Sequence, residues 1–173
     1  MKPFTYLFFL PAIIFFSSCN DPESLPVVPE IKYKSVEKIT DASGKDSLIR
    51  LTFSYLDGDG DLGLSATDTM PPFNYSPFNR FYNNVFIDYF EQKGNKFVPV
   101  TIPFTNDTVR FLYRMDVLTP DGKNKAIKGD ISVVMDLTPY EVKPQTIKFG
   151  IQIADRQLHL SNWIETPPVL MNF

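Results

Sequence analysis

Residues 147–153 have the sequence IKFGIQI, in which every second side chain is a large apolar one and the residues between are polar or small. A period of two is that of a β-strand with one face buried. The same alternation occurs over residues 49–55, 111–117 and 131–137. Residues 84–91 are apolar on both faces, which is typical of a central strand, and a Lys-Gly-Asn turn leads from them into residues 97–102.

The number and spacing of these segments predict an all-β domain. Residues 31–39 and 164–171 are weaker candidates for outer strands, since Pro167 and Pro168 suit only an edge. No segment has the period of a convincing amphipathic helix. We therefore expect an antiparallel immunoglobulin-like sandwich of seven to eight strands, formed by residues 31–173, with a jelly roll or a small barrel as the alternative.

Composition excludes several classes of function. The chain has 173 residues, of which 43% are hydrophobic and 21% charged, so neither a disordered chain nor a multi-span membrane protein fits. Its net charge of −3 gives no reason to expect a nucleic acid as partner. One cysteine and one histidine exclude an internal disulfide framework, a cysteine-cluster zinc site and a multi-histidine metal site.

The first residues have the pattern of an export signal. Lys2 precedes an almost entirely apolar run over residues 4–16, and two serines then lead to Cys19. This arrangement resembles the lipobox of bacterial lipoproteins, although Phe16 stands where the usual pattern has Leu. The resemblance implies that residues 1–18 are removed, that Cys19 carries the lipid, and that residues 19–30 form a proline-rich tether to the membrane. The alternative is a plain signal peptide cut elsewhere.

One segment carries candidate metal ligands. Asp57, Asp59 and Asp61 alternate with glycines directly after a predicted strand. Three carboxylates held close together repel one another unless a cation offsets their charge, and hard oxygen ligands favour calcium. The spacing is that of the first half of an EF-hand loop, and Asp68 falls at the twelfth position, but Leu62 occupies the sixth, where that loop needs glycine. We therefore expect a calcium loop of another kind; the alternative is a solvated Asp-Gly turn.

A second segment could complete this site. Asp155 follows the strand over residues 147–153. If this strand and residues 48–56 are the sixth and second strands of an immunoglobulin-like sandwich, Asp57 and Asp155 emerge at the same end. The hypothesis is that Asp155 joins Asp57, Asp59 and Asp61 around one calcium ion. Alternatively, Asp155 pairs with Arg156 or caps a turn.

Two stretches of sequence carry a wider resemblance. Residues 53–63, FSYLDGDGDLG, and residues 153–166, IADRQLHLSNWIET, are similar to Bacteroidota lipoproteins that have a YxDGDGDxG loop and a later DRxLxxSN segment. The resemblance implies a lipid-anchored protein of the cell envelope, at the outer membrane and periplasmic or surface-exposed. It implies a sandwich domain and no established activity.

Signals for catalysis are weaker. His159 and Ser161 could form a nucleophile pair, but no G-x-S-x-G elbow is present. Asp88, Glu91 and Glu165 could supply the paired carboxylates of a glycosidase, although no spacing singles out two of them. Trp163 and the aromatic residues of 73–82 could form a platform for a sugar, or simply pack a long loop onto the core.

Two functional hypotheses follow. The first is a non-catalytic envelope lipoprotein whose calcium-stabilised sandwich presents loops to a protein or glycan partner. The alternative is a carbohydrate-active hydrolase that uses surface carboxylates. The lack of a nucleophile motif favours the first, so the sequence assigns no catalytic residues.

Overall fold

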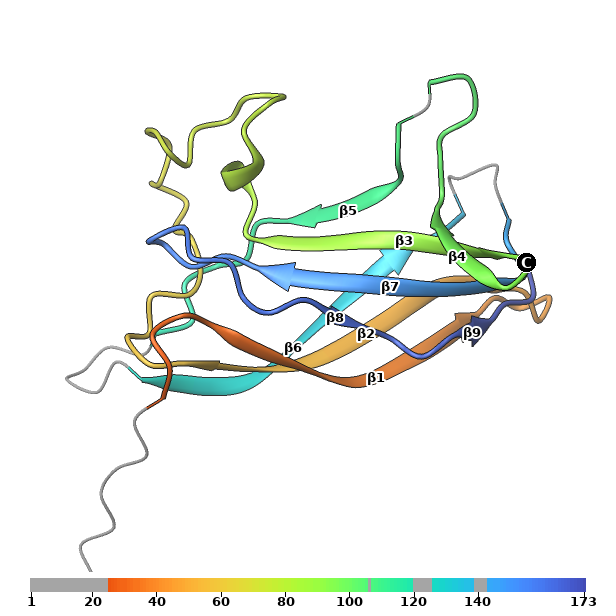
Figure 1. The fold of residues 1–173 in the computed structure, drawn as a ribbon, viewed down its shortest axis with the longest axis horizontal. Helices are drawn as coiled ribbons and strands as arrows, with labels where there is room; N and C mark the ends of the chain where they lie inside the picture. Colours follow the sequence, from red (N-terminus) through yellow and green to blue (C-terminus); the bar gives the residue numbers. More distant parts are fainter. Residues whose placement is uncertain (1–24, 106, 120–125, 139–142) are drawn as a thin grey trace, which may run out of the picture.

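A computed structural model describes residues 25–105, 107–119, 126–138 and 143–173 (Figure 1). One antiparallel sheet has the strand order β1-β2-β6. Its strands are β1 (Glu30–Thr40), β2 (Asp46–Asp57) and β6 (Ile127–Asp136). β2 is central and pairs along its length with both neighbours. From Ile49 onward its alternate residues are buried, and those between are partly or fully exposed.

The second sheet is built around β3 (Val85–Lys93) and β7 (Thr146–Ile153), which pair antiparallel. On its other side, β3 pairs with β5 (Arg110–Tyr113) and, further along, with β4 (Lys96–Pro99). The outer edge of β7 pairs with β8 (Ile164–Glu165) and β9 (Val169–Leu170). β3 is thus the central strand that its two apolar faces predict.

The fold is the antiparallel all-β sandwich that the sequence predicts. The sheets β1-β2-β6 and β3-β7-β8 correspond to the A-B-E and C-F-G sets of immunoglobulin-like domains. The described residues form nine strands, because Pro167 and Pro168 divide the last edge segment into two short pieces. β5 is shorter than the alternation over 111–117 predicts, since the backbone N–H of Met115 donates to the side-chain oxygen Asn84 Oδ1 and not to a neighbouring strand.

Large apolar side chains fill the space between the sheets. The alternating residues of 147–153 all point inward, and Phe149 packs against Tyr89 with ring centroids 5.4 Å apart. Phe53 of β2 faces them from the first sheet and is fully buried. Burial of such side chains provides the main favourable contribution to folding.

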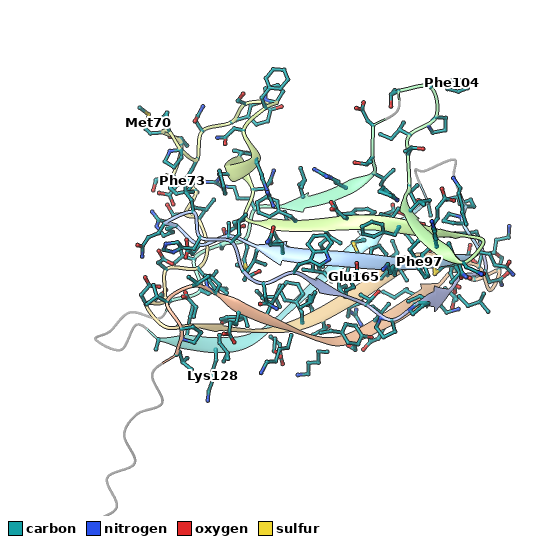
Figure 2. All side chains as sticks on the ribbon, viewed as in Figure 1. Met70, Phe73, Phe97, Phe104, Lys128 and Glu165 are labelled. Atoms are coloured by element: carbon teal, nitrogen blue, oxygen red, sulfur yellow. The ribbon has the colours of Figure 1, made fainter. Side chains whose placement is uncertain are left out.

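β2 and β7 end at the same end of the sandwich, as the sequence predicts. Leu62, just after β2, forms an antiparallel bridge with Asp155, just after β7. From here residues 64–84, the long loop, run to β3 with only a short 3-10 helix at Arg80–Tyr82. The long loop, with Met70, and residues 100–105, with Phe104, project on the same side of the molecule (Figures 1 and 2).

The predicted export signal and Cys19 lie outside the described residues, so lipidation stays a prediction. Residues 25–29 of the predicted tether are described and precede β1 without regular structure. Within the described part of the chain, no helix has the length and hydropathy needed to cross a bilayer.

Candidate metal centre

Residues 57–61, the acidic loop, begin at the last residue of β2 and turn sharply. Gly60 has a φ of +66°, a backbone conformation that residues other than glycine rarely adopt. Gly58 donates its N–H to the carbonyl oxygen of Pro26 at 2.7 Å, and a Cβ there would lie 2.2 Å from the carbonyl oxygen of Leu25. The glycines thus let the loop fold tightly and pack against the chain segment that leads into β1.

The acidic loop brings three carboxylates together. Oxygen atoms from Asp57, Asp59 and Asp61 lie within 4.8 Å of one another. On each residue the Oδ1 atom is buried and has no hydrogen-bond partner among the described residues. Asp57 is fully buried as a whole residue. Buried acceptors without donors are rare in folded proteins, and this cluster could hold a metal ion.

Two of the remaining carboxylate oxygens of the cluster accept hydrogen bonds from the protein. Asp57 Oδ2 accepts the backbone N–H of Leu62 at 3.2 Å, and Asp59 Oδ2 accepts the side-chain amide of Gln157 at 2.6 Å. Thr119 donates its hydroxyl to the carbonyl oxygen of Gly60. These contacts fix the carboxylates from outside and leave the Oδ1 atoms as the unused acceptors.

The electrostatics of the acidic loop are unfavourable without a cation. Burial, as the largest cause, together with the hydrogen bond and charge of Asp59 and the charge of Asp61, raises the pKa of Asp57 to about 7. Burial also raises the pKa of Asp61, with the charges of Asp155 and Asp59 adding to the effect. Both shifts have the causes expected for like charges brought into a poorly solvated space. A bound cation would reverse them.

Asp155 lies beside the acidic loop but serves a turn of its own. Its Oδ1 accepts the backbone N–H of His159 and its Oδ2 contacts His159 Nδ1, both at 2.8 Å. This is the turn-capping role that the sequence left as an alternative. Asp155 is not one of the three clustered carboxylates, although its charge raises the pKa of Asp61. Its role as a fourth ligand stays a prediction.

Arg156 pairs with Asp68 and not with Asp155. Its two terminal nitrogens contact the two oxygens of Asp68 at 2.5 and 2.8 Å. The hydrogen bonds from Arg156 and from the Ser65 N–H lower the pKa of Asp68 to about 2. Asp68, at the position that would complete an EF-hand loop, is therefore neutralised by an arginine and stands outside the cluster.

The candidate catalytic groups are engaged elsewhere. The Ser161 hydroxyl donates to the carbonyl oxygen of Asn162 and accepts the Ile153 N–H, while His159 contacts Asp155. The three carboxylates considered for glycoside chemistry each form an ion pair: Asp88 with Arg110, Glu91 with Lys93, and Glu165 with Lys148. Lys148 lowers the pKa of Glu165, whereas a general acid needs a raised pKa.

The sequence did not point to Gln157, Thr119 or Pro26 as neighbours of the acidic loop. Each lies far from residues 57–61 along the chain, and its residue type is common in loops. The contact with the acidic loop is therefore seen only in the folded structure. Comparison with known proteins gives no matching family model, curated protein or solved structure.

Proposed function

We propose that this protein is a non-catalytic lipoprotein of the cell envelope whose sandwich binds a structural calcium ion in the acidic loop. The observation that carries the proposal is the convergence of three buried carboxylate oxygens that have no donor within the described part of the chain, one of them on the fully buried Asp57. Calcium takes six to eight oxygen ligands at flexible geometry, whereas magnesium demands a near-ideal octahedron. An irregular loop whose ligands come from alternate residues suits calcium better.

A calcium ion at this place would join several parts of the domain. The acidic loop ends β2, contacts Pro26 ahead of β1, and continues into Leu62, which bridges to Asp155 after β7. The Leu118 N–H also donates to the Leu62 carbonyl oxygen. Neutralising the three aspartates would therefore stabilise the end of the sandwich from which the long loop starts.

The envelope location rests on the N-terminal sequence. The lipobox-like run before Cys19 and the two motifs that resemble those of Bacteroidota lipoproteins support a lipid anchor at the outer membrane. Gly58 of the acidic loop contacts Pro26, which belongs to the proposed tether. In this arrangement the anchored domain presents its loops to a partner protein or glycan.

The alternative function, a carbohydrate-active hydrolase, has less support. A glycosidase needs one carboxylate that is protonated and one that is ionised, facing a common cleft. Asp88, Glu91 and Glu165 each form an ion pair with a basic side chain, and Lys148 lowers the pKa of Glu165, which is opposite to what a general acid needs.

The proposed ion site is tested by thermal unfolding of the full-length protein in detergent, with calcium or with a chelator. At a calcium concentration of about 100 times the Kd, stability should rise by about 2.7 kcal/mol, a shift of several degrees. Asp59→Asn should lose most of this shift. Asp41→Asn, in a turn at the other end of β2, should keep it. An equal shift in wild type and Asp59→Asn would reject the site.

The anchor is tested separately, by mass spectrometry of the protein from the membrane fraction. The proposal predicts a mature chain that begins at Cys19 and carries the mass of acyl groups. An unmodified thiol on Cys19 would reject lipidation and leave the ion site unaffected.

A further inference from the structure

A pocket of about 450 Å³ lies on the outer face of the second sheet, away from the acidic loop. The long loop forms one wall, and strands β3, β5 and β7 form the floor. The side chains that matter for its chemistry are Phe78, Arg80, Asp88, Arg110, Gln152 and Trp163. They combine aromatic surface with a few polar groups, the usual composition of a small-molecule site.

The indole of Trp163 lies against the backbone of β7. A Cβ on Gly150 would be 1.9 Å from the Cζ2 atom of this ring, so the glycine is what allows the indole to approach the sheet so closely. Trp163 nevertheless remains 43% exposed and lines the pocket. Its Nε1 contacts Glu165 Oε1 at 3.4 Å, which helps to fix the orientation of the ring. The result is a supported aromatic surface that is open to solvent.

Polar groups stand in the same row of the sheet. Asp88 is opposite Gly150 on one side and opposite Arg110 on the other. Arg110 Nε contacts Asp88 Oδ1 at 3.0 Å, and both side chains keep part of their surface exposed. An aromatic surface beside a carboxylate and a guanidinium offers acceptors and donors to a ring that carries hydroxyl groups.

Arg80 connects the long loop to strands β3 and β7 beneath the pocket. Arg80 lies over the ring of Phe86, 4.2 Å from the centroid, and donates to Gln152 Oε1 at 3.0 Å. The Asn79 side chain donates to the carbonyl oxygens of Pro72 and Asn74, which shapes the loop around Phe78. Because these contacts exist in the free protein, the pocket is formed before any ligand arrives.

We propose that this pocket binds a carbohydrate, with the C–H face of a pyranose stacked on Trp163 and its hydroxyl groups bound by Asp88 and Arg110. The inference rests on the proposed role of the protein as a binding module and narrows its partner to a glycan, but it does not depend on calcium. Two guanidinium groups and one carboxylate give the pocket a net positive charge, so sugars that carry a carboxylate belong to the expected class.

The experiment uses the single tryptophan of the chain as a reporter. Fluorescence of the full-length protein in detergent is titrated with soluble β-glucan, mannan, xylan and polygalacturonate, and the same polysaccharides are cast into affinity gels. We expect at least one of them to change the fluorescence saturably and to retard the protein. In the gels, Trp163→Ala should weaken binding about tenfold, whereas Trp163→Phe should retain most of it.

Further variants separate binding from folding. Asp88→Asn should weaken binding without removing any apolar surface, and Phe104→Ser, on the other projecting loop, should bind as the wild type does. Circular dichroism checks that each variant is folded. Retardation by none of the four polysaccharides would overturn the proposal, and so would retardation of folded Trp163→Ala and Asp88→Asn equal to that of the wild type.

Repeating the titration with a chelator distinguishes this inference from the ion site. Carbohydrate binding that persists without any calcium effect on stability would reject the metal centre and keep the pocket. A calcium effect without carbohydrate binding would do the reverse.

Discussion

The two ends of β2 carry turns of similar composition and opposite electrostatics. At the start of the strand, Asp41 Oδ1 accepts hydrogen bonds from the Ser43 N–H, the Ser43 hydroxyl and the Lys45 N–H, at 2.6 to 3.0 Å. These contacts lower the pKa of Asp41. At the other end, the acidic loop leaves three Oδ1 atoms without a donor among the described residues, and the pKa of Asp57 rises.

The comparison shows that aspartate and glycine alone do not distinguish a turn from an ion site. What differs is the supply of N–H and O–H donors. The Asp41 turn provides its own and stays exposed. In the acidic loop, the Gly58 N–H donates to the Pro26 carbonyl oxygen, and the Leu62 N–H reaches only Oδ2 of the fully buried Asp57. A cation is the partner that we propose for the acidic loop.

The largest expected effect comes from the glycines beside the two turns. Gly44 and Gly63 both have left-handed φ angles, of +81° and +98°. A Cβ on Gly44 would meet nothing within 4 Å, but one on Gly63 would lie 2.2 Å from the carbonyl oxygen of Asp116. Gly44→Ala should cost about 1 to 2 kcal/mol and Gly63→Ala more than about 3 kcal/mol, measured by urea unfolding. Equal costs would show that the chain next to the acidic loop is not closely packed.

The next largest effect is on the stability of Asp57→Asn relative to the wild type, which should change sign between chelator and calcium. The folded protein raises the pKa of Asp57 above its unfolded value, so with a chelator the stability of the wild type should fall as pH rises from about 4 to about 7. At pH values above this range, Asp57→Asn should be more stable than the wild type by roughly 1 to 3 kcal/mol in chelator. With saturating calcium it should be the less stable of the two, because a ligand is lost.

Asp41→Asn is the matched control for that variant. The pKa of Asp41 is lowered on folding, so its contribution is present above the unfolded pKa and is lost as pH falls. The variant should be less stable than the wild type at neutral pH, equally with calcium and with chelator. If Asp57→Asn behaved in the same way, the contrast between the two turns would be wrong.

The smallest expected effect concerns the ion pair between Asp68 and Arg156. Asp68→Asn should cost about 0.5 to 1 kcal/mol at neutral pH, because the pair is partly exposed. The cost should disappear as pH falls from about 4 to about 2, where the lowered pKa of Asp68 lies. Calcium should stabilise this variant as much as it stabilises the wild type. Loss of the calcium shift would instead place Asp68 among the ligands.

Most of the fold could be predicted from alternation alone. The inward side chains of 147–153 and the two apolar faces around Ile87 correspond to buried positions in β7 and β3. That Asp57 and Asp155 emerge at the same end was predicted on the condition that their strands are the second and sixth of the sandwich, and the bridge between Leu62 and Asp155 confirms the shared end. These features depend on local periodicity, which can be read from the sequence, and on the small number of topologies that a sandwich can adopt.

Contacts between distant loops could not be predicted in the same way. The sequence named the three clustered aspartates but not the Gln157 amide that holds Asp59, nor the arginine that neutralises Asp68. The sequence analysis named Trp163 and the aromatic residues of 73–82. Only the pairing of β7 with β8 shows why the indole lies against Gly150. Such contacts form between segments that are far apart along the chain, and no pattern in the sequence indicates which segments pack together.

The most direct test of the account is calorimetric titration of calcium into the chelator-treated, full-length protein and its Asp57→Asn variant. The account predicts one ion bound per chain, with a Kd of about 10⁻⁴ to 10⁻³ M, and a loss of most of the heat in the variant. No calcium-dependent heat in the wild type, or the same isotherm in both proteins, would contradict it.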